Sequence, residues 1–203
     1  MKLIVLLALQ WTVRGSGVVS DLRHRVDAGF GVEPSSGVLV GVEAAVSVGD
    51  RLTLRLLTQA GSFHADASGA IDRDVAEVGV QAEVLTFPWL TAQAGLRRRT
   101  YSTNLARQPW TTIHVGAEAR VPFTETGVSG IVRAALLPGV WVRGLRQPDL
   151  AFAVASGMEY RRRRASLAVL YSLERYRFPA VGGAQRREQV VGLTLAAGWS
   201  LKR

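Results

Sequence analysis

The chain has 203 residues, of which 25 are lysine or arginine and 16 are aspartate or glutamate, so its formal net charge at pH 7 is +9. This length fits a single domain, and the absence of cysteine excludes disulfides and thiolate metal sites. The three histidines, His24, His64 and His114, do not have a metal-ligand spacing, and no apolar run is long enough for a transmembrane helix. We therefore expect no metal, no other cofactor and no helical membrane span.

The first twenty residues have the features of an export signal. Lys2 supplies a positive end, residues 3–9 form a short apolar core, and small residues lead to a cleavage point after Ser20. The sequence therefore predicts a signal peptide at residues 1–20 and a single β-domain at residues 21–203. The alternative is that the first twenty residues form a first strand or a buried helix.

Residues 38–61 have the clearest pattern in the chain. Every even position from Val38 to Val48 is valine or alanine, and the odd positions between them are mostly small or polar. After the turn residues Gly49-Asp50, leucine alternates with polar side chains again. Alternate side chains of a strand point to opposite faces, which predicts a two-faced β-hairpin. Each arm has about ten to twelve residues, close to the ~9–11 that a tilted strand needs to cross a bilayer.

The same alternation recurs along the rest of the chain, and no segment keeps the helical period of 3.6 residues. The seventh segment is the least regular, because Ile131 and Leu137 interrupt its alternation. We expect ten strands, or eight if the first or the seventh segment fails. The expected segments are 22–33, 38–48, 51–61, 75–85, 89–101, 110–123, 128–142, 150–160, 165–177 and 189–201.

The connections between these segments alternate in length. Short turns near 49–50, 87–88, 124–127 and 161–164 alternate with longer connections at 62–74, 102–109, 143–149 and 178–188. Bacterial membrane barrels have short periplasmic turns and longer outer loops, and ten strands would leave both chain ends on the periplasmic side. Only the first expected turn, at 34–37, is short where an outer loop is expected.

Large aromatic side chains favour a membrane barrel over a soluble one. They gather near the ends of the expected strands, whereas the middle positions of the apolar faces are valine, leucine and alanine. A barrel in lipid has aromatic girdles at its two interfaces, and a soluble core would place these rings at mid-strand. The expected girdle residues are Phe87, Trp89, Trp110, Phe123, Trp141, Tyr160 and Trp199.

The polar faces contain similar numbers of acidic and basic residues. In a narrow lumen such charges must pair, because an unpaired buried ion costs several kcal/mol by order of magnitude. The sequence therefore predicts a polar, mostly plugged lumen with a charge network. Its expected members are Asp27, Glu43, Arg55, Glu77, Glu83, Arg97, His114, Glu118, Arg120, Arg133, Glu159 and Glu174.

Over residues 22–201 this pattern resembles the small outer-membrane β-barrel proteins of Gram-negative bacteria. The resemblance rests on the strand periodicity and the aromatic girdles. It implies an all-β, antiparallel, up-and-down transmembrane barrel in the outer membrane, with outer-membrane lipids and lipopolysaccharide around it. The last segment, which ends at Trp199-Ser200-Leu201, resembles the signal read by the barrel-assembly machinery, although the chain continues with Lys202-Arg203.

Arginines gather at the expected outer ends of the strands. The guanidinium group pairs bidentately with phosphate, so contact with lipopolysaccharide phosphates is the expected binding role. The run 161–164 lies at the opposite end and lacks adjacent stacking aromatics, so we expect no nucleic-acid binding. The expected lipid-binding residues are Arg97, Arg98, Arg99, Arg175, Arg177, Arg186 and Arg187.

Two groups of residues raise the question of catalysis. His64, Asp66 and Ser68 have the residue types of a nucleophile, base and orienting acid, but alternate positions on an extended chain lie ~7 Å apart, too far to hydrogen bond directly. His114 and Glu118, four residues apart on one strand, lie ~13 Å apart and cannot meet. We therefore expect a structural or surface-binding barrel without catalytic residues; a narrow passive pore and a lipid-modifying barrel enzyme are the alternatives.

Overall fold

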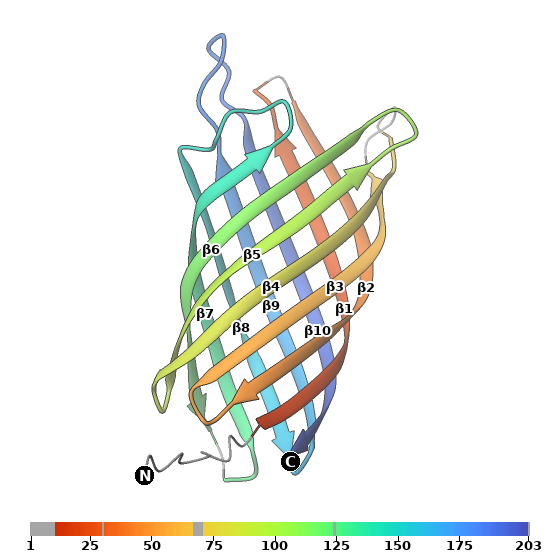
Figure 1. The fold of residues 1–203 in the computed structure, drawn as a ribbon. Helices are drawn as coiled ribbons and strands as arrows, with labels where there is room; N and C mark the ends of the chain where they lie inside the picture. Colours follow the sequence, from red (N-terminus) through yellow and green to blue (C-terminus); the bar gives the residue numbers. More distant parts are fainter. Residues whose placement is uncertain (1–10, 30, 67–70, 124, 203) are drawn as a thin grey trace, which may run out of the picture.

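The computed structural model describes residues 11–29, 31–66, 71–123 and 125–202, and it contains ten antiparallel strands that close into one barrel (Figure 1). Each strand pairs with its neighbours in the chain, and β1 pairs with β10 to close the ring. The expected ten-strand up-and-down barrel is confirmed. The strands are β1 (Trp11–Asp27), β2 (Val32–Val48), β3 (Leu52–Ala65), β4 (Arg73–Phe87), β5 (Leu90–Ser102), β6 (Arg107–Pro122), β7 (Val128–Val142), β8 (Leu150–Arg162), β9 (Ala165–Arg177) and β10 (Arg187–Lys202).

The first strand begins earlier than expected. β1 starts at Trp11, and its residues 12–27 pair with residues 187–202 of β10. The expected signal-peptide boundary after Ser20 therefore falls inside a strand that closes the barrel, and residues 11–20 belong to the barrel. Residues 1–10, which hold the apolar core of the expected signal, lie outside the described residues. The turn expected at residues 34–37 is also wrong, because these residues belong to β2.

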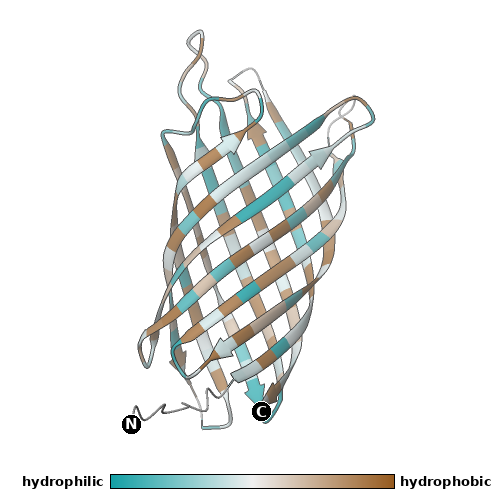
Figure 2. Cartoon of the chain, viewed as in Figure 1, coloured by the Kyte–Doolittle hydropathy of each residue, from teal (hydrophilic) through white to brown (hydrophobic). Residues whose placement is uncertain are grey.

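Side chains alternate between the two faces of the barrel wall as expected. In β2, Val38, Val40 and Val42 are exposed on the outside, whereas Leu39 and Ala45 are buried inside. Figure 2 shows the resulting change from hydrophobic to hydrophilic colour from one residue to the next along the strands. The aliphatic face therefore points outward, as in barrels that cross a membrane.

In two stretches the aliphatic side chains face the lumen. In the C-terminal part of β1, Leu22 and Val26 point into the lumen, and Arg23 and Arg25 point outward. In β7 the register with β6 shifts near Pro138, after which Val140 and Val142 face inward. The bulge exchanges the two faces of the strand beyond this point, because it adds one residue. Ile131 and Leu137 precede it and are apolar side chains on the lumen face, which made the seventh segment irregular.

The two ends of the barrel differ. Both ends of the described chain and the turns 49–51, 88–89, 123–127 and 163–164 lie at one end, which we name the terminus end; the longer connections lie at the other, the loop end (Figure 1). Exposed aromatic rings surround the terminus end. They belong to Trp11, Phe87, Trp89, Phe123, Tyr160 and Trp199.

The described part of the chain has no helix that is long and apolar enough to cross a membrane.

Candidate functional site

A cluster of aromatic and aliphatic side chains lies inside the barrel in the half nearest the loop end. Trp110 lies at its centre, with its ring centroid 5.3 Å from that of Tyr176, 6.0 Å from Phe178 and 6.2 Å from Tyr101. The ring of His24 stacks on Tyr101 at 5.2 Å. The other buried members are Leu22, Leu39, Phe63, Val75, Leu137, Val140, Val142, Ala151 and Val190. We name this set the aromatic plug.

Trp110 was expected in the girdle, and this prediction is wrong. Its side chain is 5% exposed inside the lumen, whereas Trp141, which pairs with the neighbouring Thr111, is 52% exposed on the outer face. The sequence places both tryptophans near the loop end, but proximity to a strand end does not decide which face a residue occupies. The other expected girdle residues all lie on the outer face.

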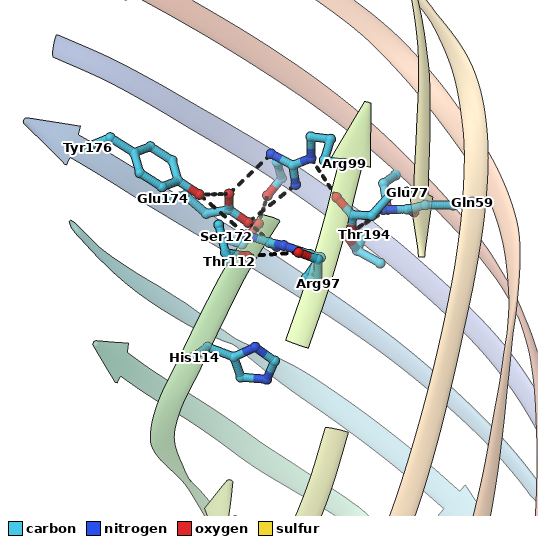
Figure 3. A network of polar contacts seen from close by, with 12 residues as sticks. Gln59, Glu77, Arg97, Arg99, Thr112, His114, Ser172, Glu174, Tyr176 and Thr194 are labelled. Carbon is cyan, nitrogen blue, oxygen red and sulfur yellow. Dashed lines mark hydrogen bonds and ion pairs between the residues drawn. The ribbon is translucent and has the colours of Figure 1, made fainter. Parts of the chain in front are cut away.

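A network of ion pairs lies directly below the aromatic plug (Figure 3). Glu174 of β9 forms ion pairs with Arg97 and Arg99 of β5 and accepts a hydrogen bond of 2.9 Å from the Tyr176 hydroxyl. Arg99 also pairs with Glu77 at 2.5 Å. Because these side chains come from opposite walls of the barrel, the network spans the lumen.

A second charged layer lies nearer the terminus end. Arg55 of β3 forms ion pairs with Glu43 of β2 and Glu83 of β4. On the other wall, Glu118 accepts hydrogen bonds from Arg120 at 2.9 Å and from Arg133 at 2.5 Å. The layer continues through Glu159, which contacts Arg120 at 3.4 Å and Arg161 at 2.9 Å.

A cavity of about 310 Å³ lies between the two charged layers. His114 borders it and contacts Gln81 through its Nε2 atom at 3.0 Å. Small and aliphatic side chains complete the lining, among them Val18, Leu57 and Leu170. The lining of the cavity therefore has a polar part and an apolar part.

The structure places eleven of the twelve expected lumen residues inside the barrel; Asp27 is the exception. Asp27 lies at the end of β1, where its carboxylate accepts a hydrogen bond of 3.0 Å from the amide of Gly29. It was assigned to the lumen because its face of the strand is polar, but in this stretch the polar face, with Arg23 and Arg25, points outward. The sequence analysis also missed Arg14, Arg99, Arg161 and Glu188 as lumen residues; extension of the alternation toward Trp11 would have indicated Arg14.

Three of the seven expected lipid-binding arginines do not face outward. Arg97 and Arg99 are inside the lumen, and Arg186 donates a hydrogen bond of 2.6 Å to the buried Glu188. Alternation separates Arg98 from its two neighbours, since only every second residue of a strand shares a face.

Exposed outward arginines do occur at the loop end of three adjacent strands, β9, β10 and β1. They are Arg175, Arg177, Arg187, Arg23 and Arg25, and we name them the arginine band.

His64 and Asp66, two of the three loop residues considered for catalysis, have different partners. The Nδ1 atom of His64 contacts the carboxylate of Asp72 at 3.0 Å, and this hydrogen bond lowers the pKa of Asp72. Asp66 instead accepts a hydrogen bond of 3.4 Å from Ser36, and Ser68 lies outside the described residues. The His64–Asp72 pair is a solvent-exposed link between the ends of two strands.

Comparisons with known proteins identify the fold. No protein-family model and no curated protein matches the chain. Among solved structures, the outer-membrane protease OmpT of Escherichia coli is similar with a TM-score of 0.60 and 9% sequence identity, over 95% of this chain and 97% of that one. An outer-membrane channel from Pseudomonas putida F1 gives a TM-score of 0.53 and 12% identity, over 96% and 97%. The translocator domain of the autotransporter NalP from Neisseria meningitidis gives 0.50 and 10%, over 90% and 87%. The architecture is that of the outer-membrane β-barrel proteins, without a specific subfamily.

Proposed function

We propose that this chain is a closed outer-membrane β-barrel that binds the phosphate groups of lipopolysaccharide on its outer surface, in a structural or surface-binding role. The arginine band is the observation that supports it. On neighbouring strands, Arg187 pairs in register with Arg177, and Gln189 with Arg175. Among the described residues, none of the five band arginines forms an ion pair, and the nearby outward carboxylates are Asp21 and Asp27. Five like charges with two acids beside them favour an anionic partner.

The depth of the arginine band agrees with this partner. On β10, Arg187 and the girdle residue Trp199 both face outward, and Val191, Leu193 and Leu195 lie between them on the same face. At ~3.3 Å per residue the two ends are about 40 Å apart along the strand, or about 30 Å across the membrane at a tilt near 40°. This is the thickness of a hydrocarbon layer. With Trp199 at the periplasmic interface, the band lies at the headgroups of the outer leaflet.

Substitution of Arg175, Arg177 and Arg187 by serine is expected to weaken binding of bisphosphorylated lipid A by about 100-fold. The estimate assigns ~1 kcal/mol to each arginine near an anionic surface. Binding is measured by titration of lipid A into the refolded protein in zwitterionic detergent at low and high NaCl, because screening must reduce the difference. The matched control replaces Arg162, Arg163 and Arg164 at the terminus end, which removes the same charge. Equal losses in both variants would contradict the proposal. So would wild-type protein that binds dephosphorylated lipid A as tightly as bisphosphorylated lipid A.

The barrel is expected not to conduct ions. The aromatic plug and the Arg97–Glu174–Arg99 network lie across the lumen, which supports a closed barrel, because a narrow passive pore would need a continuous aqueous path. In planar bilayers the purified protein should give no stable single-channel steps above the leak of protein-free bilayers. Reproducible unitary currents would show that the lumen opens and would favour the pore.

A further inference from the structure

The cavity in the lumen contains one positive charge without a partner. The terminus-end layer has five arginines, Arg14, Arg55, Arg120, Arg133 and Arg161, and four glutamates, Glu43, Glu83, Glu118 and Glu159. Each of the other four arginines forms an ion pair with one of these glutamates. Arg14 borders the cavity and, among the residues that the structure describes, has no ion pair or hydrogen bond.

The surroundings of Arg14 do not supply the missing counter-ion. The cations Arg55, Arg120 and Arg161 act on Arg14 together with the anion Glu159, and Glu159 already contacts Arg120 and Arg161. Glu43, the nearest inward carboxylate on β2, is paired with Arg55. An uncompensated cation in a confined lumen is costly unless an anion accompanies it. The network nearer the loop end is already balanced, with two arginines and two glutamates. The lumen as a whole therefore favours one additional negative charge.

Hydroxyl groups stand beside Arg14 on the same side of the cavity. Ser16 is the next inward-facing residue of β1, and Ser166 of β9 faces it across Gly198 of β10. A Cβ atom at Gly198 would collide with the Ser16 hydroxyl and crowd that of Ser166. The glycine thus lets two hydroxyls approach each other where they border the cavity, and hydroxyls donate hydrogen bonds to oxyanions.

The rest of the cavity suits an apolar group. Val18, Leu57, Ile131 and Leu170 line it, and its volume of about 310 Å³ is at the lower end of small-ligand pockets. The aromatic plug blocks the loop end, so a ligand would enter from the terminus end, which faces the periplasm in the proposed orientation. A phosphate dianion would overcompensate a single cation, whereas a carboxylate would balance it.

We propose that the lumen binds a small amphiphilic monocarboxylate from the terminus end. Arg14 is the counter-ion, Ser16 and Ser166 donate hydrogen bonds to the carboxylate, and Val18 and Leu170 contact the apolar chain. The site is separate from the arginine band, because Arg14 faces inward and the band faces outward.

Calorimetric titration with hexanoate tests the proposal on the refolded full chain in nanodiscs. Wild-type protein should bind hexanoate saturably, Arg14→Ala should weaken this binding at least about tenfold, and Arg14→Lys should restore most of it. Arg23→Ala, on the outward face of the same strand, is the matched control and should bind as wild type. The mobility shift of unboiled samples on gels confirms that each variant is a closed barrel.

The comparison ligands are hexanol, which lacks the charge, and inorganic phosphate, which lacks the chain. The proposal requires both to bind more weakly than hexanoate. It is overturned if wild-type protein shows no saturable hexanoate binding, if folded Arg14→Ala binds hexanoate as tightly as wild type, or if phosphate binds as tightly as hexanoate.

Discussion

Replacement of Glu174 by alanine is expected to lower the free energy of unfolding by about 3–5 kcal/mol, the usual cost of removing one partner from a buried ion pair. Glu174 is the common partner of Arg97 and Arg99, and it also accepts the Tyr176 hydroxyl hydrogen bond. Without it, Arg99 keeps its ion pair with Glu77, whereas Arg97 keeps only a hydrogen bond of 3.4 Å to the Tyr176 hydroxyl among the described residues. Guanidinium chloride unfolding of the refolded protein in detergent micelles measures the loss.

Two further variants separate the charge of Glu174 from its shape. Glu174→Gln keeps an acceptor for Tyr176 but removes the charge, so we expect an intermediate loss. Glu125→Ala removes an exposed carboxylate in the β6–β7 turn and should change the free energy of unfolding by less than about 0.5 kcal/mol. A loss below about 1 kcal/mol for Glu174→Ala would mean that water replaces the carboxylate and that the network does not hold the lumen closed.

The regular part of the barrel could be predicted because its two faces differ in polarity. From Val38 to Val48 every second side chain faces outward and is aliphatic, so the period of two is visible in the sequence. The inward positions can be small, polar or charged provided that charges pair, which is why Glu43, Arg55 and Glu118 could be assigned to the lumen from alternation alone.

The assignment of faces fails near the loop end. There, outward positions of β1 carry Arg23 and Arg25, and inward positions carry Leu22 and Val26. The pattern keeps its period of two but reverses its polarity. Single-sequence alternation assigns residues to two faces but cannot say which face is the lumen at such a place. Trp110 was misplaced for another reason: it shares its face with Thr112, His114 and Glu118, but its position near a strand end was read as a girdle position. Pairings such as His64 with Asp72 depend on loop geometry that no spacing rule fixes.

Trp110→Ala is expected to lower the free energy of unfolding by about 3–5 kcal/mol, the usual cost of truncating a buried tryptophan. The indole ring contacts Tyr101, Tyr176 and Phe178, and its removal leaves a void at the centre of the aromatic plug. The ring nitrogen is buried and has no hydrogen-bond partner among the residues that the structure describes. Trp110→Phe keeps most of the ring contacts and removes this unpaired N–H, so we expect a much smaller loss than for alanine.

Trp141→Ala is the matched control, because the two tryptophans lie on adjacent strands near the same end of the barrel but on opposite faces of its wall. Trp141 is 52% exposed to the surrounding medium, where detergent or lipid replaces the contacts that the ring makes. Its truncation should cost less than about 1 kcal/mol in the same guanidinium chloride titration, well below the loss for Trp110→Ala. A larger loss of free energy of unfolding for Trp141→Ala than for Trp110→Ala would contradict the interior position of Trp110 and place its ring in the outer girdle.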